Sequence, residues 1–181
     1  MKNSVLSALV AGALGLAAAS AYAGDGTITF NGALTATTCT INGNGTSAKN
    51  FTVKLPTVST NLLKTAGDTA GRTSYTVALT GCTPVTTTSK ASVFYEAGST
   101  VDPIDGRLIV ATGGAGNVKL QLLNADGTAI KAGYSTDLQN MAWASIASGA
   151  ATLSYQAQYY ATGATTAGAA NSSVVYSIAY Q

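Results

Sequence analysis

Hydrophobic residues occupy every second position in a series of short runs along the chain. Such alternation turns one face of a β-strand toward a core and the other toward water. The runs are Ile28, Phe30 and Leu34; Phe51, Val53 and Leu55; Tyr75, Val77 and Leu79; Val93 and Tyr95; Leu108 and Val110; Val118, Leu120 and Leu122; Leu153, Tyr155, Ala157 and Tyr159; and Val174, Tyr176, Ile178 and Tyr180. Clusters of Gly, Asn, Asp, Ser and Thr separate them and are typical of turns. The pattern predicts an all-β fold, a β-sandwich.

One stretch departs from this alternation. In residues 59–68, the apolar positions Leu62, Leu63 and Ala66 have helical spacing. We expect a helical turn that connects two strands.

The first 23 residues have the pattern of a signal peptide. Lys2 gives a positive start, an apolar run of about 15 residues follows, and Ala21-Tyr22-Ala23 has the small-x-small form of a cleavage site. The run is shorter than the ~20 residues that a membrane-spanning helix needs. We therefore predict export with cleavage after Ala23, although small residues also permit cleavage after Ala19 or Ala21.

The remaining residues, 24–181, suffice for one domain with a sizeable core. Cys39 and Cys82 are the only cysteines. In an exported chain, an even pair of cysteines favours a disulfide over two free thiols. We predict that these two are joined.

Composition argues against several functional classes. The chain has 9 Lys or Arg and 7 Asp or Glu without a basic block, which gives no reason to expect nucleic acid as a partner. It has no histidine, so it cannot form a Ser-His-Asp or Cys-His arrangement or complete the usual zinc ligand sets. Asp102 and Asp105 flank Pro103 and are interpreted as turn formers. We predict no catalytic residue, no metal and no cofactor.

Four stretches, in order, resemble the structural pilins of type 1-like fimbriae, which the chaperone-usher pathway assembles. "GTITFNGALTATTCTI" resembles the family's opening strand and first cysteine, and "FTVKLPTVST" its second strand with a Leu-Pro ending. "AGRTSYTVALTGC" resembles the strand that leads to the second cysteine. "YQAQYYATGATTAGAANSSVVYSIAYQ" resembles the terminal strand-loop-strand with its penultimate tyrosine. Together they cover essentially the whole mature sequence.

The resemblance implies an incomplete immunoglobulin-like β-sandwich that lacks its final strand, which leaves a groove open on the core. In such pilins a periplasmic chaperone first fills the groove with a strand of its own. The N-terminal extension of the next subunit then replaces that strand. The implied organisation is a signal peptide at 1–23, a donor-strand extension at 24–32 and a pilin domain at 33–181.

The resemblance also assigns roles to both ends of the mature chain. In the extension, Gly26, Ile28 and Phe30 lie on one face of a strand and are the expected donor residues, with Gly26 where the groove is shallow. At the other end, Val174, Tyr176, Ile178 and Tyr180 are the expected groove-edge positions. The chaperone is expected to pair with this strand and to anchor the carboxylate of Gln181.

The function implied is that of a structural subunit, most simply a major one, that polymerises by donor-strand exchange into the shaft of an adhesive bacterial fimbria. Its expected partners are identical or related pilin subunits, a periplasmic chaperone and an outer-membrane usher. It would pass through the periplasm to an extracellular fimbria on the bacterial surface. The alternative is a monomeric secreted binding module with a complete immunoglobulin-like fold.

Overall fold

The computed structural model describes residues 27–32 and 34–181. The chain separates into two units, Met1–Leu34 and Thr35–Gln181. The predicted signal peptide and Gly26 lie outside the described residues. In the first unit, the described residues carry no helix or strand. Among the described residues, no helix is long and apolar enough to cross a membrane.

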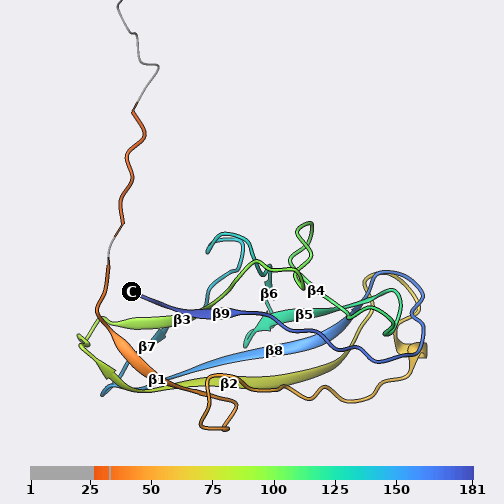
Figure 1. The fold of residues 1–181 in the computed structure, drawn as a ribbon, viewed down its shortest axis with the longest axis horizontal. Coiled ribbons are helices and arrows are strands. Elements are labelled where there is room, and N and C mark those ends of the chain that lie inside the picture. The colour runs from red at the N-terminus through yellow and green to blue at the C-terminus, as the bar shows by residue number, and fades with distance from the viewer. Residues whose placement is uncertain (1–26, 33) are drawn as a thin grey trace, which may run out of the picture. The chain divides into compact units, whose positions relative to one another are not determined.

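The second unit is built from two antiparallel sheets (Figure 1). The larger sheet has the order β1 (Thr38–Gly43), β2 (Thr69–Thr83), β8 (Ala151–Ala161), β5 (Val118–Asn124) and β4 (Leu108–Ile109), and β6 (Ala129–Ile130) also pairs with β5. The smaller sheet has the order β7 (Ala144–Ser145), β3 (Lys90–Tyr95) and β9 (Tyr176–Tyr180). The predicted all-β class is confirmed.

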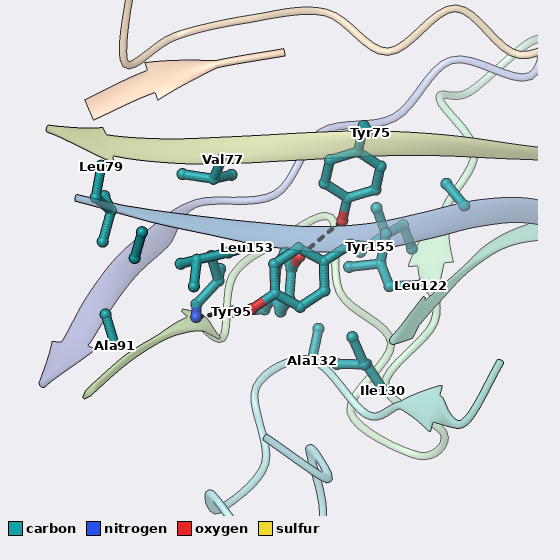
Figure 2. Packing of buried hydrophobic residues seen from close by; sticks show 14 of the residues in the cluster. Tyr75, Val77, Leu79, Ala91, Tyr95, Leu122, Ile130, Ala132, Leu153 and Tyr155 are labelled. Carbon is teal, nitrogen blue, oxygen red and sulfur yellow. Dashed lines mark hydrogen bonds between the residues drawn. The ribbon is translucent and has the colours of Figure 1, made fainter. Parts of the chain in front are cut away.

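The core lies between the two sheets and follows from the alternation in sequence. Tyr75, Val77 and Leu79 of β2 are buried, as are Leu153 of β8 and Val93 of β3. Because successive side chains of a strand point to opposite faces, residues two apart share one face of the sheet. Figure 2 shows Tyr75, Val77, Leu79, Leu153 and Tyr155 of the larger sheet packed with Ala91 and Tyr95 of the smaller one.

Three tyrosines link the sheets through their hydroxyl groups (Figure 2). The Tyr75 and Tyr95 hydroxyls are hydrogen-bonded at 2.7 Å, and the Tyr155 hydroxyl accepts from the Val93 backbone N–H at 2.9 Å. Burial raises the pKa of the Tyr75 and Tyr95 hydroxyls, so both groups stay neutral. These three buried hydroxyl groups therefore all have hydrogen-bond partners, as a stable core requires.

The predicted disulfide joins Cys39 at the start of β1 to Cys82 near the end of β2, with the Cα atoms 4.1 Å apart. The bridge closes a long loop, since the two residues are 43 apart in sequence. In the chain-entropy model, a loop of this size stabilises the fold by up to ~4 kcal/mol.

Two expectations for the connection between β1 and β2 have different outcomes. The helical turn is present as a short 3-10 helix, Thr60–Leu62, and the Ser59 side chain accepts from the Asn61 N–H at its start. The strand expected at Phe51, Val53 and Leu55 is not assigned. Its alternation is nevertheless present, because these three side chains pack against the core while Thr52 and Lys54 are exposed. The segment therefore has the alternation of a β-strand, but among the described residues no neighbouring strand pairs with it.

Candidate functional site

Strand β9 presents one paired and one unpaired edge. Its register with β3 pairs Tyr95 with Tyr176 and Val93 with Ile178. Backbone hydrogen bonds to the β3 side are made by Val175, which accepts from the Glu96 N–H, and by Gln181, which exchanges two bonds with Lys90. Hydrogen-bonded pairs alternate along an antiparallel ladder, so the intervening residues point their N–H and C=O groups to the other edge. Within the described residues, no strand pairs with that edge.

The residues at this unpaired edge also point their side chains toward the core. They are Val174, Tyr176, Ile178 and Tyr180, all partly buried and packed against the main hydrophobic cluster. Burial raises the pKa of the Tyr176 and Tyr180 hydroxyls, which keeps them neutral. The neighbouring Val175 faces outward and is exposed. These four positions thus combine free backbone groups with apolar side chains on one face.

Residues 51–58, here called the unpaired segment, form the second border of this part of the core. Phe51 lies edge-on to the Tyr176 ring with the centroids 6.1 Å apart, and the Tyr176 hydroxyl donates to the Lys49 carbonyl at 2.6 Å. Val53 and Leu55 pack against the same cluster as β9 does. In the described part of the chain, the unpaired segment makes no backbone–backbone hydrogen bond. Among the described residues, the core is therefore bordered by β9, which has no ladder partner on one of its edges, and by the unpaired segment, which has none.

An extended chain with an apolar residue at every second position has the chemistry to fill such a site. Its backbone would pair with the free groups of β9, and its alternate side chains would cover the half-buried core. The site can thus accept one further β-strand, and none of the described residues of the second unit occupies that place.

The first unit contains a stretch with that pattern. Ile28 and Phe30 are 79% and 88% exposed, and Leu34 is fully exposed. Several large apolar side chains exposed along one short stretch are typical of an interaction segment. Gly26, the remaining donor residue expected from sequence, lies outside the described residues.

The two aspartates on either side of Pro103 lie in turns. Asp102 accepts from the Ile104 N–H and Asp105 from the Arg107 N–H, so both form the turns predicted for them. Lys119 bridges their carboxylates at 2.6 and 2.8 Å. Among the described residues, no group of three or more His, Cys, Asp or Glu side chains is placed to hold a metal ion.

Comparisons with known proteins give one consistent result. Residues 55–181 match the family model described as FimA, type-1 fimbrial protein, A. The chain is 46% identical over 177 residues to the F17 fimbrial protein of Escherichia coli, covering 95% of this chain and 97% of the relative. It is 44% identical over 173 residues to the major fimbrial subunit SMF-1 of Stenotrophomonas maltophilia, strain K279a, covering 92% of this chain and 99% of the relative.

A solved structure shares the fold. The crystal structure of an antigen and type I fimbria protein of Burkholderia pseudomallei superposes with a TM-score of 0.56 at 29% identity. The match covers 79% of this chain and 99% of that one.

Proposed function

Because the chain belongs to the type-1 fimbrial protein family, we propose that it polymerises by donor-strand exchange into the shaft of an adhesive bacterial fimbria. The observation that carries this proposal is the unpaired edge of β9. Its free backbone groups and inward apolar side chains belong to the same residues. Strand addition at such an edge is an established mode of recognition, and chaperone–pilin complementation is one of its known instances.

The proposed donor is the N-terminal stretch of another copy, with Gly26, Ile28 and Phe30 toward the groove. Leu34 continues the same alternation, and a side chain built at Gly32 would meet nothing within 4 Å in the free chain. Full burial of Ile28 and Phe30 would contribute ~1.5 to 3 kcal/mol each. Each ladder hydrogen bond would add ~1 kcal/mol net. Several such contributions together are enough to hold two subunits.

Before polymerisation, we propose that a periplasmic chaperone covers the same groove and that an outer-membrane usher receives the subunit. Val174, Tyr176, Ile178 and Tyr180 would pair with the chaperone strand, and the carboxylate of Gln181 would be anchored by it. Gel filtration of periplasmic extract tests this step. Co-elution with a second, different polypeptide is expected, whereas a well-folded lone monomer would support the secreted binding module instead.

The decisive experiment compares two charges placed on opposite faces of the donor stretch. Ile28→Asp would bury an unpaired carboxylate in the groove at a cost of several kcal/mol, which the remaining Phe30 contact cannot offset. Thr29→Asp places the same charge on the face that points away from the groove. With each variant as the only copy, electron microscopy should show no fibres for Ile28→Asp and fibres for Thr29→Asp. Normal fibres from Ile28→Asp would show that this stretch is not the donor.

A further inference from the structure

The smaller sheet has a second border, on the side of β3 that faces away from β9. There, the N–H and C=O groups of Ala91, Val93 and Tyr95 point away from β9, because the hydrogen bonds to the β9 side are made by the alternate residues, such as Lys90 and Glu96. Strand β7 pairs only with the first part of β3, through Ala91 and Lys90. A sheet border left open in this way is a template for another strand.

Groups from outside β7 occupy the rest of this border. The Gly133 backbone N–H donates to the Tyr95 carbonyl at 2.9 Å, and side chains make the other hydrogen bonds. The Val93 N–H donates to the Tyr155 hydroxyl at 2.9 Å. The Tyr95 N–H donates to Gln139 Oε1 at 2.9 Å, and Gln139 Nε2 donates back to the Tyr95 carbonyl at 3.0 Å. The carboxamide of Gln139 therefore offers Tyr95 the same acceptor and donor that the backbone of a paired strand would offer.

Gln139 is held in this position by its surroundings. It is 1% exposed, and its Nε2 also donates to the Tyr134 carbonyl at 2.8 Å. The Ser92 hydroxyl donates to the Ala142 carbonyl at 2.8 Å, which fixes the following part of the same loop against β3. A buried amide whose donors and acceptor are all used is a costly group to displace.

We propose that Gln139 acts as a substitute strand that closes the β3 border, so that the smaller sheet accepts another chain only at β9. This inference rests on the proposed function. The smaller sheet would then have a single accepting edge, and strand addition to this sheet would extend a fibre without branching it. An open β3 border would give the subunit a second accepting edge, at which a fibre branches or aggregates. Gln139 is thus a positioning residue for the specificity of strand addition.

A synthetic peptide with the sequence of residues 24–34 tests this proposal by stoichiometry. Native mass spectrometry of the mature chain mixed with excess peptide should show one peptide bound per wild-type subunit. The double variant Gln139→Ala/Ser92→Ala should bind a second peptide. The matched control is Gln121→Ala, which removes another buried glutamine amide, bonded to Gln158 on the larger sheet, and should bind one peptide. A folded double variant that still binds one peptide would overturn the proposal.

Amide hydrogen exchange gives a second test, and its first comparison uses the wild-type chain alone. The Val93 and Tyr95 amides should be protected before any peptide is added, whereas the Tyr176 and Ile178 amides should gain protection only with peptide. Gln139→Ala alone should speed exchange at Tyr95 by about tenfold or more, from the loss of its hydrogen-bond partner. A Tyr95 amide that exchanges as fast as Tyr176 in the free wild-type chain would refute closure of this border.

The two experiments separate failure of this proposal from failure of the proposed function. If no peptide binds to any protein, strand exchange itself is wrong, and the hydrogen-exchange data still decide the role of Gln139.

Discussion

At the scale of single residues, ion pairs and a cation–π contact hold the loop from Val101 to Arg107 against the larger sheet. Lys119 on β5 contacts both Asp102 and Asp105, and Arg107 stacks 3.6 Å from the centroid of the Tyr160 ring. The hydrogen bond from Lys119 is the largest cause of the lowered pKa of Asp102. For Asp105, burial acts in the opposite direction, but hydrogen bonds from Lys119 and Arg107 outweigh it and lower the pKa.

This cluster predicts a loss of stability in acid. A carboxylate whose pKa is lower in the folded state stabilises the fold above its unfolded pKa of about 3.9, and the gain disappears as pH falls through the folded value. The melting temperature should therefore drop as pH falls below about 4. Lys119→Met should flatten this part of the profile, as measured by circular dichroism. An unchanged acid profile in Lys119→Met would show that other carboxylates control it.

The Tyr155 hydroxyl gives a second prediction at this scale. Tyr155→Phe should lower the free energy of unfolding by ~1 to 3 kcal/mol, because the buried Val93 N–H loses its acceptor. Tyr160→Phe is the control, since its ring still stacks on Arg107 and a change within ~0.5 kcal/mol is expected. Denaturant titration measures both. Equal effects from the two substitutions would mean that the hydrogen bond to Val93 contributes little.

At the scale of elements, alternation in the sequence was enough to locate the strands that build the core. The inward residues of β2, β8 and β9 are the ones that the pattern predicts, because one face of each strand meets the core. The unpaired segment was also predicted as a strand. It is not assigned as one, since strand assignment requires a ladder partner and periodicity reports only which side chains face inward.

The candidate site, too, could be predicted from the sequence only in part. The alternation at Val174, Tyr176 and Ile178 indicated a strand, but only the register with β3 shows that their backbone groups lie on the free edge. No sequence pattern pointed to Gln139, because it lies in a loop without hydrophobic periodicity. Its hydrogen-bond partner Tyr95 is 44 positions away in the sequence. Contacts of that kind follow from tertiary packing rather than from local pattern.

The end of β9 predicts how the subunit depends on its last two residues. Removing Tyr180 and Gln181 deletes one of the four groove-edge side chains and both backbone bonds between Gln181 and Lys90. We expect reduced accumulation in the periplasm, because the strand that we propose pairs with the chaperone is shortened. The control is Val175→Thr at the exposed position just before the same strand. Immunoblots of periplasmic fractions decide this, and normal accumulation of the truncated chain in complex with its chaperone would contradict it.

At the scale of the whole molecule, the proposed donor residues and β9 both lie in stretches of sequence without charged side chains. The sequence contains no Asp, Glu, Lys or Arg from Gly26 to Ala48, and none from Leu138 to Gln181. The first stretch includes the proposed donor residues Gly26, Ile28 and Phe30 but not Asp25, and the second includes β9. Burying a charge without a partner costs several kcal/mol, whereas hydroxyl and amide groups can be satisfied within a ladder. A copy of the chain can therefore place the part of its N-terminal stretch that begins at Gly26 beside β9 of a neighbour without desolvating an ionised side chain.

The proposed donor stretch should affect the stability of the fibre without affecting that of the subunit. Phe30 is 88% exposed in the free chain, so Phe30→Ala should leave the melting temperature of the monomer unchanged within error. In the fibre the same ring would be buried, and its loss should cost ~3 to 5 kcal/mol for each subunit contact. Fibres of Phe30→Ala should dissociate at clearly lower denaturant concentration than wild-type fibres, while Thr29→Ala fibres should match the wild type. Gel filtration after incubation in a denaturant series measures dissociation. If Phe30→Ala destabilises the monomer as much as the fibre, the ring belongs to the core of its own subunit, and donation of this stretch to a neighbour is excluded.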